Sequence, residues 1–128
     1  MAITSETSKV LSASIKEGSI FQVIDSIATD ETKSDAIDAL MADGVSIIVV
    51  TSTGVSGGVV EIEGSATSDY AGTWQSLGSI TTSAASTTYI KSVALANNAA
   101  AMPVPYVRAR ISTVISGGTV DVFIVVKR

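Results

Sequence analysis

The carboxylates best placed to do chemistry in this sequence are Glu61 and Glu63, which stand two residues apart. Residues two apart on a β-strand point to the same side, so the pair suits acid–base catalysis or the binding of a cation. Val60 and Ile62 alternate with them, which predicts that the apolar side chains face a core. No second group of carboxylates supports a site in the sequence. We therefore expect Glu61 and Glu63 to form the ordinary solvent face of a strand.

Tyr106, Arg108 and Arg110 also share one side of an expected strand, while Val107 and Ala109 point to the other. The basic pair suits cross-strand pairing with acidic neighbours in the same chain. Arginine and tyrosine are also enriched where proteins contact one another. Both interpretations stay open, and Tyr106, Arg108 and Arg110 are the candidate partner-contact residues.

The sequence holds no histidine and no cysteine, so the commonest catalytic bases, nucleophiles and metal ligands are missing. A nucleophilic serine would need a lysine as its base, and the spacing of Lys9, Lys16, Lys33 and Lys91 indicates no such dyad. Residues 65–72 form an expected turn without the repeated acidic ligands of a calcium loop. No glycine-rich phosphate motif precedes a helix. We expect no catalytic, cofactor-binding or metal-binding residues, and a protein that is not an enzyme.

Trp74 is the one tryptophan of the chain. A lone tryptophan in a β domain serves as a core anchor or as a platform for a sugar ring. Because Leu77 follows in the same expected strand, the sequence favours the core. The alternative is a carbohydrate site formed by Trp74 with Tyr70 or Tyr89.

The composition is apolar and poor in charge, with 46% hydrophobic and 16% charged residues. Surplus apolar surface usually meets a partner. The net charge of −4 disfavours a nucleic-acid partner. The apolar run of residues 45–50 is far shorter than the roughly 20 residues of a membrane-spanning helix. Residues 1–8 have neither the basic nor the apolar part of a secretion signal, so we expect synthesis in the cytoplasm and no membrane partner.

Short runs that alternate β-branched and polar residues predict strands along most of the chain, at residues 20–27, 45–50, 59–63, 73–77, 89–95, 106–114 and 119–126. The run at 45–50 predicts a strand covered on both faces. The last two strands predict a β-hairpin closed at residues 116–118. Residues 35–42 fit a helix and a strand equally well.

These elements predict an all-β protein, an antiparallel β-sandwich or jelly roll. Residues 1–19 are rich in serine and threonine with isolated aliphatic residues, a composition that can pair as an edge strand. We expect them to form an extended N-terminal arm. Residues 20–128 then form a single sandwich domain.

Four segments occur in an order that resembles small structural proteins of tailed bacteriophages: residues 60–65 (VEIEGS), 72–80 (GTWQSLGSI), 105–111 (PYVRARI) and 117–122 (GGTVDV). The resemblance covers about residues 20–128 and is a pattern of strands and turns without active-site residues. It implies a head decoration (cement) protein that binds the outside of the capsid as a homotrimer and stabilises it. Its partners would be copies of itself and the major capsid protein, its location would be the virion exterior, and no cofactor is implied.

The same pattern also occurs in head–tail connector, neck and tail proteins, which are the first alternative. A carbohydrate-binding module of a fibre is an alternative of another class. For a decoration protein, residues 1–19 would reach a capsid subunit or a neighbouring copy.

Overall fold

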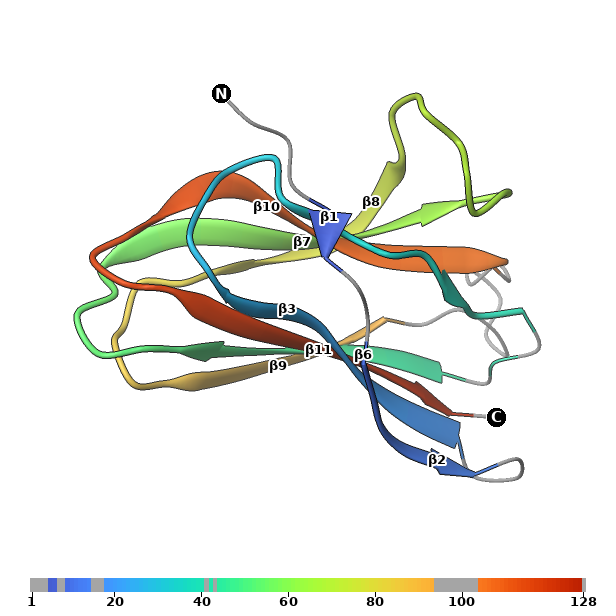
Figure 1. The fold of residues 1–128 in the computed structure, drawn as a ribbon, viewed down its shortest axis with the longest axis horizontal. Helices are drawn as coiled ribbons and strands as arrows, with labels where there is room; N and C mark the ends of the chain where they lie inside the picture. Colours follow the sequence, from blue (N-terminus) through green and yellow to red (C-terminus); the bar gives the residue numbers. More distant parts are fainter. Residues whose placement is uncertain are drawn as a thin grey trace.

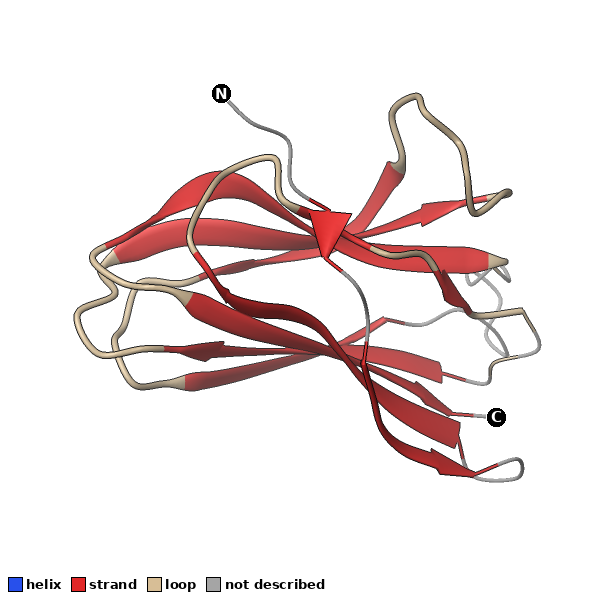
Figure 2. Cartoon of the chain, in the orientation of Figure 1, coloured by secondary structure: helices blue, strands red, loops and turns tan. Residues whose placement is uncertain are grey.

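The protein is an antiparallel β-sandwich in which two sheets stack face to face (Figure 1). This computed structural model describes residues 5–6, 9–14, 18–40, 42, 44–93 and 104–127. Figure 2 shows strands and loops, and no helix is present among these residues. The predicted all-β sandwich is confirmed.

Sheet A consists, in spatial order, of β1 (Ser5–Glu6), β4 (Lys33–Ser34), β10 (Tyr106–Ser116), β7 (Gly57–Ser65) and β8 (Gln75–Thr81), with β5 (Ile37–Asp38) also paired to β10. Sheet B consists of β2 (Lys9–Ser14), β3 (Gly18–Ile27), β11 (Val120–Lys127), β6 (Gly44–Thr51) and β9 (Thr88–Val93). All pairs are antiparallel except β1 with β4. Each strand predicted from the sequence overlaps one of these, and residues 94–95 of one prediction lie outside the described residues.

The core lies between the sheets because the central strands alternate buried and exposed positions, most regularly β6 and β11. In β6, Val45, Ile47 and Val49 are buried while Ile48 and Val50 are partly exposed. The prediction of a strand at 45–50 is confirmed, but the prediction that both of its faces are covered is wrong. No layer of the described chain packs on the outer side of sheet B, so only one face of β6 is buried.

Residues 35–42, which fit a helix and a strand equally well, contain the short strand β5. Ile37 and Ala39 are buried and Leu40 is exposed, as expected for a period of two. The Asp38 carboxylate accepts a hydrogen bond from the backbone N–H of Leu40 at 2.9 Å, a local turn that ends the strand.

The predicted arm, residues 1–19, contributes backbone pairing to both sheets. β1 pairs with β4 in sheet A, and β2 pairs with β3 in sheet B. β3 begins at Gly18, two residues before the predicted strand. Residues 1–4, 7–8 and 15–17 lie outside the described residues, and a contact of the segment with a partner stays a prediction.

The predicted hairpin of the last two strands is wrong, because β10 belongs to sheet A and β11 to sheet B. Each strand has one fully buried side, and these sides meet across the core instead of pairing edge to edge. The connection lies beside the β6–β7 connection, which also crosses between the sheets. Ser56 N donates to Ser116 O at 2.9 Å, and Ser52 N donates to Thr119 O at 3.0 Å.

Two glycines, Gly54 and Gly117, make this close approach of the connections possible. Their φ angles are +89° and +85°, in the left-handed region that other residues rarely adopt. A Cβ on Gly54 would lie 2.6 Å from the carbonyl oxygen of Gly117. Both conformation and space therefore require glycine here.

Lys91 stands on the core-facing side of β9, an edge strand of sheet B. Its pairing partner Ile47 is buried, and Val93, two residues along β9, is buried as well. The stem of Lys91 crosses to β8, the edge strand of sheet A, because a Cβ on Gly78 would lie 2.9 Å from Lys91 Cε. One cation thus occupies the gap between the two edges.

Replacing Gly117 with alanine is expected to lower the free energy of unfolding by at least about 1 kcal/mol, because the new Cβ meets the carbonyl of Gly54 in a left-handed backbone. Gly44→Ala is the matched control, since no atom lies within 4 Å of its Cβ position. Urea denaturation measures both variants. Equal stability of the two would contradict the proposed role of the crossing.

Candidate functional site

The outer face of sheet A carries a cluster of charged side chains where β7 and β10 pair. Glu63 stands opposite Arg108, and Glu61 stands opposite Arg110. The alternation that turns Ile62 into the core turns these four residues outward. Cross-strand neighbours of opposite charge therefore meet in pairs.

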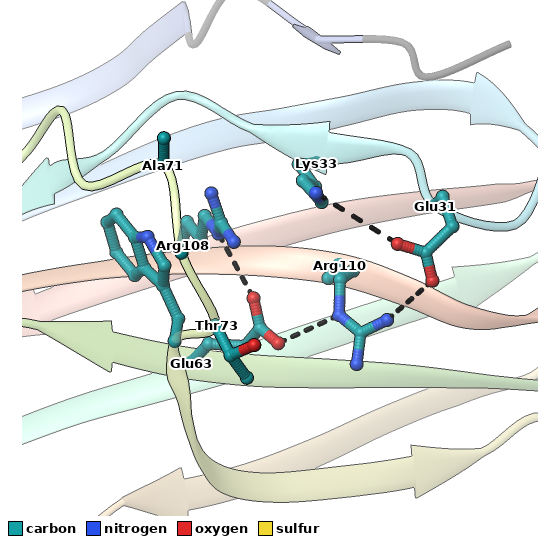
Figure 3. Close-up of a pocket in the computed structure, with 9 residues that line it drawn as sticks. Glu31, Lys33, Glu63, Ala71, Thr73, Arg108 and Arg110 are labelled. Carbon is teal, nitrogen blue, oxygen red and sulfur yellow. Dashed lines mark hydrogen bonds and ion pairs between the residues drawn. The ribbon is translucent and has the colours of Figure 1, made fainter.

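The Glu63 carboxylate binds both arginines. Arg108 Nε donates to Glu63 Oε1 at 3.0 Å, and Arg110 Nε donates to Glu63 Oε2 at 2.8 Å. Arg110 also contacts Glu31 at 2.7 Å (Figure 3) and Glu61 at 3.4 Å. We call Glu31, Glu61, Glu63, Arg108 and Arg110 the arginine–glutamate network.

The prediction that Glu63 faces solvent is wrong. Its side chain is only 3% exposed, whereas that of Glu61 is 19% exposed. The residues that precede β8 fold back over this part of the sheet, where Ala71 and Thr73 lie near Glu63 and Arg108 (Figure 3). Trp74 lines the same pocket as the Glu63 carboxylate. Sequence alternation gave the correct side of the strand but no information on the loop that covers it.

Trp74 is buried, at 3% exposure, but it lies on the outer side of sheet A and outside the cluster between the sheets. The Arg108 guanidinium carbon lies 4.1 Å from the centre of its ring, a cation–π contact. Trp74 Nε1 donates to the carbonyl of Tyr70 at 2.9 Å. The prediction that Trp74 is buried is correct, but the prediction that it lies in the core is wrong.

The aromatic residues of the carbohydrate alternative do not gather in one site. The face of Trp74 is covered by Arg108. Tyr89 lies in β9 of the other sheet, where its hydroxyl accepts a hydrogen bond from Ala84 N at 3.0 Å. Tyr70 is 51% exposed on the loop before β8. A stacking platform made of these rings is therefore not formed.

The candidate partner-contact residues differ in their surroundings. Arg108 and Arg110 are paired within the chain, as one of the two interpretations expects. Tyr106 is partly buried and pairs along the backbone with Ser65 and Asp38, apart from the arginine–glutamate network. A contact of these three residues with a partner stays a prediction.

Glu31 is the member of the network that sequence reasoning missed. It lies in a segment expected to be a polar loop, and its φ of +63° is unusual for a residue with a side chain. Its backbone N–H donates to Ile111 O at 2.8 Å, which fixes it beside β10. Lys33 Nζ lies 4.0 Å from its carboxylate. Only the order of strands in sheet A brings Glu31 to Arg110, and no local sequence signal marks it.

The network alters the ionisation of two of its members. Burial alone would lower the pKa of Arg110, but its hydrogen bond to Glu63 and the charges of the three glutamates raise that pKa above its ordinary value. A hydrogen bond from Ser76 is the main cause that lowers the pKa of Glu61. Ser112 and Arg110 add to this effect, and burial opposes it. Both groups stay charged at neutral pH.

An open pocket of about 310 Å³ lies above the network, lined by Glu31, Lys33, Glu63, Ala71, Gly72, Thr73, Trp74, Arg108 and Arg110. Within the described ranges, histidine, cysteine, aspartate and glutamate side chains form no group of three or more suited to a metal ion. No described helix is long and apolar enough to span a membrane.

The outer face of sheet B carries a group of apolar side chains, with polar residues such as Gln22, Ser46 and Asp121 beside them, in contrast to the charged outer face of sheet A. Phe123, Ile48 and Ile90 are neighbours in one row across three strands. Val125 and Ile20 are neighbours in the next row. Ile90 is 67% exposed, Ile20 is 36% exposed, and Ile48, Phe123 and Val125 are partly exposed. We call Ile20, Ile48, Val50, Ile90, Phe123 and Val125 the apolar face.

No protein-family model matches the sequence, and no curated protein matches it closely enough to count as a relative. Among solved structures, the K2 cleaved adhesin domain of Lys-gingipain is similar, with a TM-score of 0.57 and 14% identity over 94% of this chain and 70% of that chain. The K3 domain from Porphyromonas gingivalis W83 has a TM-score of 0.54 and 14% identity over 94% and 73%. The K1 domain from the same source has a TM-score of 0.54 and 14% identity over 89% and 64%. At this identity the likeness shows a shared β-sandwich fold.

Replacing Glu63 with glutamine is expected to lower the free energy of unfolding by roughly 3–5 kcal/mol, because two partly buried guanidinium groups lose their shared counter-charge. Glu61→Gln is the matched control. It should have a much smaller effect, since Arg110 keeps Glu31 and Glu63. Chemical denaturation at neutral pH measures both, and equal losses would refute the central place of Glu63.

The lowered pKa of Glu61 predicts a pH dependence of stability. Its folded-state pKa lies below the unfolded value of about 4.5, so its contribution is fully present above that value. The contribution is lost as the pH falls through the folded pKa. Between neutral pH and this acid range, Glu61→Gln should therefore lose less stability than the parent protein in urea titrations. Parallel pH profiles of the two proteins would exclude this role.

Proposed function

We propose that this chain is a structural protein of a virus particle, a head decoration protein of a tailed bacteriophage. It self-associates into a homotrimer and binds the major capsid protein on the exterior of the shell. The observation that carries the proposal is the apolar face of sheet B. The resemblance of the sequence to phage structural proteins is the reason for proposing a phage head as the particle and the major capsid protein as the partner.

The apolar face is large enough to matter for assembly. It spans four neighbouring strands, β3, β11, β6 and β9. With strands about 4.8 Å apart and residues about 3.3 Å apart, the part of the sheet that holds these six side chains covers roughly 300 Å², and it also includes outward polar residues such as Gln22, Ser46 and Asp121. Exposed apolar side chains grouped within a polar surround are often binding sites on soluble proteins. Left uncovered, such a face would promote aggregation, so a second copy of the chain is its natural cover.

Self-association through sheet B leaves the outer face of sheet A free. That face carries the arginine–glutamate network and suits a polar contact with a capsid subunit. Contacts that exist only in the assembled shell stabilise it by mass action. Three linked copies bind more tightly than one because each bound copy raises the effective concentration of the others.

The arrangement of ionisable groups supports a binding role over a catalytic one. Both oxygens of Glu63 accept hydrogen bonds from arginines, and Glu31 and Glu61 are engaged by Arg110. These carboxylates are committed to holding strands together and are poorly suited to proton transfer. The charges of these carboxylates therefore stabilise the fold of the sandwich.

A connector, neck or tail protein is the second candidate within the same class of particle. Rings of six or twelve copies are expected at those positions, so the number of copies in solution separates the two candidates. Light scattering of the purified protein gives that number. A stable monomer without affinity for phage heads would refute both.

Replacing Ile90 with aspartate is expected to weaken self-association by at least about tenfold, because a charge must then be buried against apolar side chains. Val114→Asp is the matched control, since Val114, at 50% exposure, is also an exposed aliphatic residue but lies in β10 of sheet A. Analytical ultracentrifugation over a range of concentrations measures both variants. If both dissociate equally, or neither does, the apolar face is not the interface.

A further inference from the structure

Three cations line the pocket above the arginine–glutamate network, and the carboxylate of Glu61 contacts one of them, Arg110, from outside the lining. Lys33, Arg108 and Arg110 line it together with only two carboxylates, those of Glu31 and Glu63. Its volume of about 310 Å³ lies at the lower end of the range of about 300–1,000 Å³ for ligand sites. The space suits a small charged group better than a whole cofactor.

Arg108 is held rigidly at this pocket. Its Nε is bound to Glu63 at 3.0 Å, and its guanidinium carbon lies 4.1 Å from the ring centre of Trp74. The side chain is 13% exposed. Among the described residues, its two terminal Nη groups donate no hydrogen bond, and Figure 3 shows the end of the guanidinium directed away from Glu63 toward Ala71. Partly buried donors of this kind favour an acceptor.

The charges that surround Arg108 determine which kind of hydrogen-bond acceptor the pocket favours. A phosphate dianion would place two negative charges beside the carboxylates of Glu31 and Glu63, whereas a carboxylate places only one there. A charged acceptor also forms shorter and stronger hydrogen bonds than a neutral one. A carboxylate carries one charge and two coplanar oxygens, which match the paired donors of an arginine. Lys33, whose only described ion pair is the 4.0 Å contact with Glu31, lies on the opposite side of the same space.

We propose that this pocket binds a carboxylate group through the Nη groups of Arg108, with Lys33 as the second cation. The group is supplied either by a small free carboxylate or by an acidic residue of a protein partner. The inference depends on the pocket alone and goes beyond the proposed assembly. Failure of self-association would leave it standing.

Trp74 provides the probe, because it is the one tryptophan of the chain and it touches Arg108. Sodium acetate and a blocked glycine–glutamate–glycine peptide are each titrated while indole fluorescence is recorded, with sodium chloride at equal ionic strength as reference. A saturable change with acetate or peptide, and none with chloride, is expected. An affinity at least tenfold higher for the peptide assigns the site to a protein partner, and equal affinities assign it to free carboxylates.

Variants separate the pocket from general charge effects. Lys33→Gln should weaken binding roughly two- to fivefold, as expected for a partly exposed charge. Lys91→Gln, which removes a cation outside the pocket, should leave binding unchanged. Arg108→Lys keeps the charge, loses the paired donors and should abolish saturation, with its urea midpoint confirming that it is folded. No saturable change with either carboxylate, tighter binding of inorganic phosphate than of acetate, or equal effects of Lys33→Gln and Lys91→Gln would overturn the proposal.

Discussion

The buried carboxylate of Glu63 sets the strongest constraint on this sandwich. A charge that is 3% exposed is tolerable only with close counter-charges, and the Nε atoms of Arg108 and Arg110 supply them at 3.0 and 2.8 Å. Both contacts require one register between β7 and β10. A slip by one residue would turn Glu63 into the apolar core and Ile62 outward. The ion pairs on one side of sheet A and the aliphatic packing on the other therefore enforce the same pairing.

The two outer surfaces of the sandwich have opposite character. Sheet A presents charged residues that the segment before β8 partly covers, with the guanidinium carbon of Arg108 over the ring of Trp74. Sheet B presents Ile48, Ile90 and Phe123 in one uncovered row. The core between them is aliphatic on both sides, so the difference arises only from the residues at alternate positions of each strand. One small domain thereby offers two chemically distinct contact surfaces.

Alternation in the sequence was enough to predict the strands and the sandwich, because a period of two follows from local geometry. It was not enough to predict neighbours. β10 and β11 read as a hairpin yet lie in different sheets, and Glu31 reaches Arg110 only through the order of strands. The apolar outer positions of β6 were attributed to a second covering layer, whereas they remain partly exposed. Which side of a strand a residue points to is a local property. Whether that side is covered, and which residue it contacts, depends on the topology of the whole sandwich.

Lys91 has a consequence for how the domain meets other molecules. An exposed edge strand is a template on which a foreign strand can continue the sheet, and a cation directed inward at such an edge opposes that continuation. Lys91 opposes such pairing at β9, and its stem lies across Gly78 of β8. One side chain therefore protects the edge strands of both sheets on that side of the sandwich. Growth of either sheet into a ribbon or fibril from this side would force an ammonium group out of water.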